Sequence, residues 1–264
     1  MKMNCFIRQV KMDIMRSIFS VRFVLFVLLF AIILSASETE RFISAISQQG
    51  TDTVMQVIFH NLVMDKFKII MVILLSCIYT KSFCDDYNSN YLRCILSRID
   101  VTLYAQSKIV VNAMANIFGS MLGFSVSAAF LSIFLPLVSN DIDVGNREFA
   151  IAHPVCYILL MGLVFGLVAA ACSTIGLLVS VFQPNAFVSI AFAGLLFFLV
   201  VSYIPENSIF DVLSVILLLP TFTRDNETGF VDILWNILYP SLVIYICGVM
   251  FRIKLEWRVK NGYI

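Results

Sequence analysis

The sequence predicts an all-α polytopic membrane protein with six transmembrane helices, an N-terminal amphipathic helix and a re-entrant segment before the last span. Three observations predict this fold. Apolar residues make up 60% of the 264 residues and charged residues only 13%, whereas a soluble domain is about 45–50% apolar and about 25% charged. Long apolar runs recur along the chain, and basic segments alternate with acidic ones between them. These features exclude a soluble globule, a disordered chain and a disulfide-rich secreted scaffold.

Residues 1–18 are expected to form an amphipathic helix along the membrane surface. Apolar side chains recur at helical spacing from Met3 to Ile18, and basic residues occupy much of the remaining surface. The alternative is the first part of a signal peptide, because the apolar run at 23–36 ends in Ser-Ala-Ser. We favour the surface helix, since the segment is too long and too regular for a signal peptide.

Six apolar runs are long enough to cross the membrane, because a crossing helix needs about 20 residues. They cover residues 19–36, 67–83, 109–138, 155–182, 186–204 and 231–251. A further apolar stretch at 209–220 is too short to cross a core about 30 Å thick. It lies in segment 205–230, which we expect to be re-entrant on the outer side.

The distribution of basic residues predicts that both termini are cytoplasmic. Of the 18 lysines and arginines, 13 lie in the N-terminal segment, the 81–108 connection and the C-terminal tail. The remaining segments hold five bases but 12 of the 17 acids. Because cytoplasmic loops are enriched in Lys and Arg, this alternation fits six spans with both ends inside the cell.

The sequence offers little support for enzyme chemistry. It has no G-x-x-x-x-G-K-[ST] loop for ATP, and its two histidines, His60 and His153, are isolated. We therefore expect no catalytic residue, no metal ligand and no cofactor in this chain. The net charge of +1 gives no reason to expect nucleic-acid binding.

Small and amide residues predict close helix packing within the membrane. Gly119 with Gly123, and Gly162 with Gly166, each form a G-x-x-x-G pair, and small residues let helices approach closely in lipid. We favour packing within the chain over a dimer interface.

Two amides, Asn112 and Asn116, share one face of the third span. In lipid they need partners, so we expect hydrogen bonds between helices near the cytoplasmic end. A place in a translocation path is the alternative.

The 81–108 connection contains a short amphipathic stretch. Its apolar residues cluster on adjoining faces, whereas Arg93 and Arg98 lie elsewhere around the helix. A helix of this kind can lie across the membrane surface and bind a cytoplasmic partner. The alternative is a solvated connector, although connectors are usually shorter. The apolar residues are Tyr91, Leu92, Ile95, Leu96 and Ile99.

This layout resembles the permease subunit of ATP-binding-cassette exporters of the second type, which include bacteriocin- and lantibiotic-immunity permeases. That family has an amphipathic elbow helix, six spans and both ends inside. Its first cytoplasmic connection carries an acid, Gly-Thr, a Leu-rich helix, a Pro-containing turn with Arg, and a Lys that opens the third span. Here Ser89-Asn90 replaces Gly-Thr, and Ile99 stands near the expected Pro. The matching residues are Asp86, Leu92, Leu96, Arg98 and Lys108.

The resemblance implies that residues 1–264 form one transmembrane permease domain of a bacterial plasma membrane, with a cytoplasmic coupling region at 84–107. A separate ATPase subunit would bind ATP and Mg²⁺, and a second permease subunit, the same or a related chain, would complete the exporter. Its cargo would be an amphipathic or peptide substrate, such as an antimicrobial peptide, moved by alternating access. The residues implied to couple to the ATPase are Asp86, Tyr91, Leu92, Arg93, Leu96 and Arg98.

Three alternatives remain open. A stand-alone six-span secondary transporter or channel would show ionisable residues or broken helices near the middle of the membrane, and these are scarce. A membrane enzyme would need a convergent catalytic cluster. A membrane anchor or sensor would need neither feature.

Overall fold

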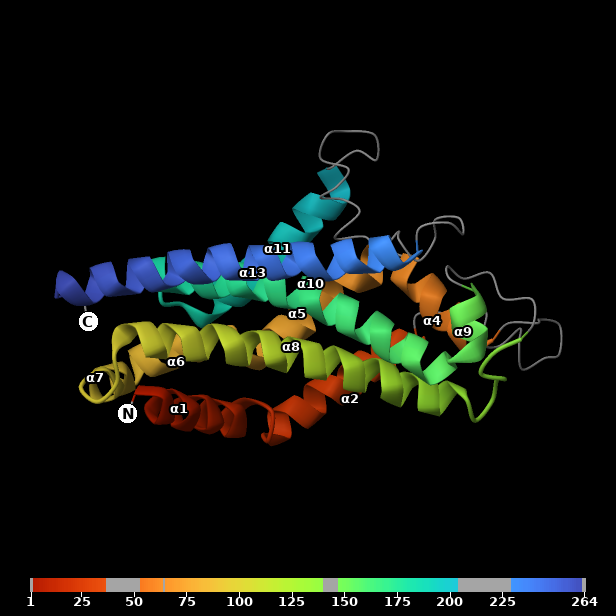
Figure 1. Cartoon of the computed structure of the whole chain (residues 1–264), viewed down its shortest axis with the longest axis horizontal. Helices are drawn as coiled ribbons and strands as arrows, with labels where there is room; N and C mark the ends of the chain where they lie inside the picture. Colours follow the sequence, from red (N-terminus) through yellow and green to blue (C-terminus); the bar gives the residue numbers. More distant parts are fainter. Residues whose placement is uncertain (1, 37–52, 64, 140–146, 204–228, 263–264) are drawn as a thin grey trace.

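Helices form all the regular structure of the described residues (Figure 1). The computed structural model describes residues 2–36, 53–63, 65–139, 147–203 and 229–262. In chain order the helices are α1 (Lys2–Ser17), α2 (Val21–Ala36), α4 (Val54–Val63), α5 (Asp65–Tyr79), α6 (Ser82–Asn88), α7 (Tyr91–Leu96), α8 (Val101–Leu131), α9 (Arg147–Ala152), α10 (Pro154–Phe182), α11 (Ala186–Tyr203) and α13 (Gly229–Lys260).

Several of these helices are long and apolar enough to cross a membrane. The four candidates in the described chain are Phe67–Asn88, Val101–Leu131, Pro154–Phe182 and Asn236–Lys260. A fifth is the pair Cys5–Ser17 and Val21–Ala36, which is bent by 57° at its break, and Ala186–Leu199 is a shorter apolar helix. The described part of the chain is therefore all-helical, and its four or five candidate spans are compatible with a multi-pass membrane protein.

Some helix boundaries differ from the predicted ones. The third span was placed at 109–138, but α8 begins at Val101 and ends at Leu131, because the helix continues through polar residues that an apolar run does not include. Helix α4 was not predicted; it buries Val54, Met55 and Ile58. The predicted re-entrant segment at 205–230 falls almost wholly outside the described residues.

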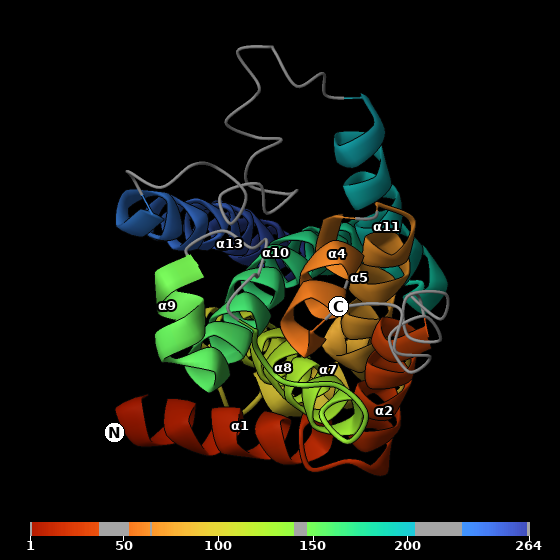
Figure 2. The ribbon, with the colours of Figure 1, turned by 90° about the vertical axis from the view of Figure 1, so that its right-hand side faces the viewer.

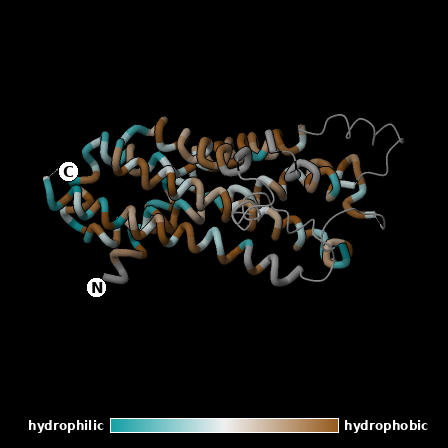
Figure 3. The backbone as a smooth tube through the Cα atoms, turned by 90° about the horizontal axis from the view of Figure 1, so that it is seen from above, coloured by the Kyte–Doolittle hydropathy of each residue, from teal (hydrophilic) through white to brown (hydrophobic). Residues whose placement is uncertain are grey.

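The bundle has one end at which α6, α7, the start of α1 and the end of α13 lie together, whereas α4 and α9 lie at the other end (Figure 1). We call the first of these the α7 end. Hydrophilic residues gather there, and hydrophobic residues dominate the middle of the bundle (Figure 3). Helix α10 is the central helix, because it packs against α5, α8, α11 and α13. Helix α1 lies across the bundle axis rather than along it (Figure 2).

Three phenylalanines join α2 to the centre of the bundle. The ring of Phe30 lies 5.5 Å from that of Phe124 and 6.0 Å from that of Phe165, and the last two rings are 5.9 Å apart. Tilted and edge-on ring pairs at such distances are favourable beyond the area they bury. The rings come from α2, α8 and α10, so this cluster fixes the C-terminal half of α2 against α8 and α10.

The two predicted glycine pairs face different neighbours. A Cβ atom on Gly162 would lie 2.8 Å from the Cα of Met121, and one on Gly166 would lie 2.7 Å from the Cα of Ile117. These glycines therefore let the backbones of α10 and α8 touch. Gly119 and Gly123, on α8, instead face side chains of α5 and α2, among them Leu75 and Phe30.

The close approach of Gly166 to the backbone of α8 predicts a stability effect. Replacing Gly166 with alanine should lower the free energy of unfolding by about 1–3 kcal/mol, because the added methyl meets the α8 backbone, which cannot move alone. Thermal or denaturant unfolding in mild detergent, followed by circular dichroism, measures this. Gly119→Ala is the matched control, since its Cβ would meet only side-chain ends, 3.0 Å from Leu75 and 3.1 Å from Ile78. Equal effects of the two substitutions would contradict the assignment.

Candidate functional site

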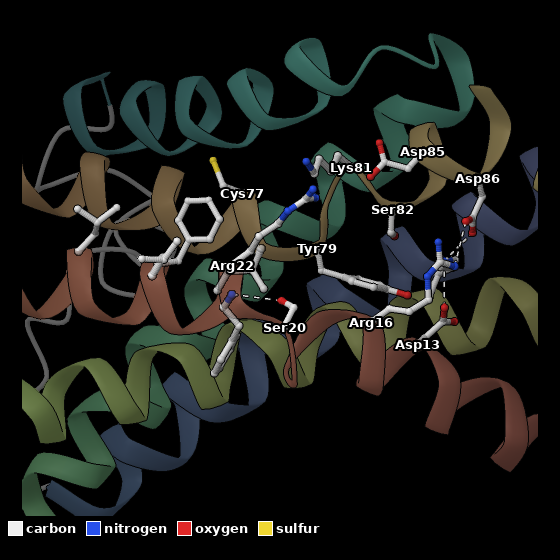
Figure 4. Close-up of a pocket in the computed structure, with 16 residues that line it drawn as sticks. Asp13, Arg16, Ser20, Arg22, Cys77, Tyr79, Lys81, Ser82, Asp85 and Asp86 are labelled. Carbon is white, nitrogen blue, oxygen red and sulfur yellow. Dashed lines mark hydrogen bonds and ion pairs between the residues drawn. The ribbon is translucent and has the colours of Figure 1, made fainter. Parts of the chain in front are cut away.

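A buried ion cluster joins α1, α6 and α8 at the α7 end. The Lys108 Nζ atom lies 2.8 Å from Asp86 Oδ2 and 3.3 Å from Asp13 Oδ1. All three side chains are 1% exposed. The Arg16 guanidinium lies 3.3 Å from Asp86 Oδ1 and is 53% exposed, so it covers the cluster from outside. Figure 4 shows Asp13, Arg16 and Asp86 converging at one end of a cavity.

Neighbouring side chains complete the hydrogen bonding of the two carboxylates. The Tyr104 hydroxyl donates to Asp86 Oδ2 at 3.0 Å. Ser107 Oγ and Gln9 Nε2 both donate to Asp13 Oδ2, at 3.3 and 3.2 Å. Two cations face two anions, so the cluster is neutral, as a buried charged group requires.

Aromatic rings surround the buried ammonium group. Lys108 Nζ lies 5.2 Å from the centroid of the Tyr79 ring and 5.3 Å from that of the Tyr104 ring, distances at which a cation is attracted to a ring face. At the outer side of the cluster, the Arg16 guanidinium, which is always charged in proteins, pairs with Asp86.

The cluster includes one residue that the sequence analysis missed. Asp13 is the only acid in the first 37 residues, within an otherwise basic amphipathic helix. Gln9, Asp13 and Ser17 follow one another at intervals of one helical turn and together form a buried polar face of α1. Exposed apolar residues, Ile7 and Met15 among them, lie on another face. The spacing of this single acid from Gln9 and Ser17, four residues on either side, could have indicated a buried polar face of the helix.

Helices α6 and α7 form a short helix pair that is anchored to the bundle. Asn90 connects them in the left-handed conformation, with φ of 58°, which asparagine tolerates better than most residues. Leu92 and Ile95 are buried in a cluster with Phe83, Tyr104 and residues of α13. The apolar face of α7 is therefore used for internal packing.

The residues implied to couple to an ATPase separate into two groups. Asp86 and Leu92 are buried, at 1% exposed each, and Leu96 is half-buried. Tyr91, Arg93 and Arg98 are exposed. The first group holds the helix pair in place, and the second forms its outer surface, with the Arg16 guanidinium 5.4 Å from the centroid of the Tyr91 ring.

The two predicted amides lie in a buried polar network between helices. Asn112 Nδ2 donates to Thr174 Oγ1 at 3.3 Å, and Ser173 Oγ donates to Asn112 Oδ1 at 2.8 Å. Ser173 also shares a 2.6 Å hydrogen bond with Thr80. The network thus connects α5, α8 and α10, and Asn116 joins it by donating to the Asn112 carbonyl oxygen at 2.7 Å.

In the part of the chain that the structure describes, no group of three or more His, Cys, Asp or Glu residues could hold a metal ion. Comparison of the chain with protein-family models, with curated proteins and with solved structures gave no match in any of the three. The functional argument therefore rests on the residues and their geometry.

The ion cluster predicts a strong penalty for removing its central cation. Lys108→Met should lower the free energy of unfolding by about 3–5 kcal/mol, because it leaves two buried carboxylates with one partial partner. Adding Asp86→Asn should recover part of this loss, with a coupling on the order of 1–3 kcal/mol. Denaturant titration of the single and double variants in mild detergent gives both values.

The half-exposed pair formed by Arg252 and Glu256 is the control for this experiment. Its side chains are 41% and 30% exposed and its atoms are 3.5 Å apart. Glu256→Gln should therefore change the free energy of unfolding by less than about 1 kcal/mol. If Lys108→Met were as mild as this control, the cluster would not be a source of stability.

Proposed function

We propose that this chain is the transmembrane subunit of an ATP-binding-cassette exporter, and that a separate ATPase subunit docks on the helix pair α6–α7. The observation that carries the proposal is the anchoring of this pair: its inner face is packed and ion-paired, and its outer face presents Tyr91, Arg93 and Arg98. If a partner is to move the membrane-spanning helices by pushing on α6–α7, this helix pair must be packed firmly against them.

The contacts of Asp86 supply a route for such force. Asp86 lies on α6, and its ion pair with Lys108 is a direct 2.8 Å link to α8. Through Arg16 the same carboxylate is also linked to α1. Movement of α6 would therefore be passed to a long candidate span and to the N-terminal helix together.

The proposal includes the finer topology that the sequence suggests. Helix α1 is the elbow helix, and the six spans are α2, α5, α8, α10, α11 and α13. The whole chain is one permease domain in a bacterial plasma membrane, with both termini and the α7 end in the cytoplasm. Hydrophilic residues at the α7 end support this placement (Figure 3). A second permease subunit, identical or related, completes the exporter, and its cargo is an amphipathic or peptide molecule.

A stand-alone secondary transporter is the second candidate. The observation that favours it is the buried Lys108 with its two aspartates, since ionisable groups inside membrane proteins often mark proton or ion paths. The cluster lies at the α7 end rather than in the middle of the bundle, whereas secondary transporters bind near the midplane. This position favours the exporter subunit.

Cysteine labelling tests the proposed orientation. Cys94 is exposed on α7, and His153 is exposed at the opposite end. In intact cells a membrane-impermeant maleimide should label a single cysteine introduced as His153→Cys, but should label Cys94 only after the membrane is opened. Mass spectrometry measures the labelled fraction. Labelling of Cys94 in intact cells would contradict the cytoplasmic docking surface.

Charge reversal on α7 and in the turn that follows it tests the proposed ATPase docking. Leu92 is buried, so an aspartate there would disturb the fold of the helix pair as well as docking. The exposed Arg93→Glu and Arg98→Glu substitutions are sharper. Together they should reduce co-purification of the ATPase subunit, and the ATP hydrolysis of the purified complex, at least tenfold. The reason is that charge reversal replaces attraction across the interface by repulsion between like charges. Quantitative mass spectrometry and phosphate release measure the two effects.

The control reverses two exposed bases of other helices at the same end, Lys11→Glu on α1 and Lys260→Glu on α13. This variant should keep the ATPase subunit. Undiminished ATPase binding by the α7 variant would overturn the proposed docking surface, as would the absence of any ATPase subunit from the unmodified complex.

A further inference from the structure

A cavity of about 380 Å³ lies between the bend that joins α1 to α2 and the start of α6 (Figure 4). One part of its wall is the ion cluster already described. A second part is basic and polar and includes Arg22, Lys81 and Ser82. The third part is apolar and is formed by α2. The apolar residues are Phe23, Leu25, Phe26 and Leu29.

The charges of the wall leave one positive charge in excess. Within the cluster, Lys108 and Arg16 balance Asp13 and Asp86. The remaining charged residues of the wall are Arg22, Lys81 and Asp85. Neither Arg22 nor Lys81 has an ion-pair partner among the residues that the structure describes. The cavity is thus suited to a ligand that carries a single negative charge.

The two unpaired cations lie close to one another. Figure 4 shows the side chains of Arg22 and Lys81 extending toward each other, away from Asp13 and Asp86. Arg22 is exposed and Lys81 is half-buried. Two like charges repel each other, and an anion between them, like solvent, offsets this repulsion. Their arrangement therefore favours an anionic group at this side of the cavity.

Two hydroxyl groups in the same wall have no partner. The Tyr79 hydroxyl and Ser82 Oγ are buried and make no hydrogen bond within the described chain, and Tyr79 is only 4% exposed. A buried donor without an acceptor destabilises the fold. Figure 4 shows the Tyr79 side chain extending toward Arg16 and Asp13, so its hydroxyl lies at the ion-cluster end of the cavity, away from Arg22 and Lys81.

The apolar part of the wall continues onto the outer surface of the bundle. Leu25 is 54% exposed and Leu29 is 45% exposed. Because α2 belongs to a candidate span, this surface faces lipid chains in a membrane. A ligand in the cavity could therefore place its polar part beside Arg22 and its apolar part along α2.

We propose that this cavity binds an anionic glycerophospholipid from the leaflet at the α7 end. Its phosphate lies between Arg22 and Lys81, and one acyl chain follows Leu25 and Leu29. A free phosphate offers the same anionic chemistry, but only a lipid uses the apolar wall. This site requires a membrane and does not depend on the ATPase partner.

Tryptophan quenching by brominated lipids tests the proposal in the full chain. The reporter is Leu25→Trp in a protein whose own tryptophans are replaced by phenylalanine, placed in nanodiscs of phosphatidylcholine with a minor share of phosphatidylglycerol. Brominated phosphatidylglycerol should quench more strongly than brominated phosphatidylcholine. Each cation contributes about fivefold to the relative association constant, and the pair up to about thirtyfold. Arg22→Gln with Lys81→Gln should remove this preference.

Matched variants separate a site from general surface charge. Arg93→Gln with Arg98→Gln removes the same charge from α7 and the turn after it and should keep the preference. Arg22→Lys with Lys81→Arg should also keep it, by conserving the charge at the cavity. Circular dichroism confirms that each variant is folded. Water-soluble glycerol phosphate should not displace the brominated lipid.

Three results would overturn the proposal. The first is an equal preference for both lipids in the unmodified reporter protein. The second is a preference that persists in Arg22→Gln with Lys81→Gln, or that is lost equally in the α7 variant. The third is displacement by glycerol phosphate, which would assign the cavity to a soluble phosphate compound instead.

Discussion

The ion pair between Lys108 and Asp86 is the interaction on which the α7 end of this protein depends. A buried ammonium group is tolerated only when carboxylates and hydrogen bonds surround it, and here these come from α1, α6 and α8. The requirement fixes three segments that are far apart in the sequence. It also explains why α6 and α7 remain packed on the bundle although both are short helices, which have little stability of their own.

Close helix packing and hydrogen bonds, rather than ion pairs, stabilise the rest of the bundle. In lipid there is no hydrophobic force between helices, so close contact and interhelical hydrogen bonds stabilise the packing. Gly162 and Gly166 allow α10 to touch α8, and the Asn112 network connects the same two helices. The aromatic cluster around Phe30 then attaches α2. Polar pairing at one end and tight packing along the middle are therefore complementary.

Composition and apolar runs were sufficient to predict an all-helical membrane protein, because lipid imposes length and polarity on every span. The glycine pairs and amides were recognisable for the same reason. The sequence could not show which helix each glycine faces, since both G-x-x-x-G pairs look alike. It also could not show that Leu92 is buried or that Asp13 pairs with Lys108. Periodicity identifies an apolar face, but the left-handed turn at Asn90 decides what covers that face.

The central position of α10 limits how this protein can change shape. Neighbours surround this helix on several sides, and its glycines lie close to the backbone of adjacent helices, so sliding or rotating it would disturb the whole interior at once. Helix α13 carries a row of exposed apolar residues, including Leu242, Ile246 and Met250, and can shift against lipid with less disturbance. A conformational cycle of this bundle would therefore keep α10 as a fixed axis while the outer helices tilt around it.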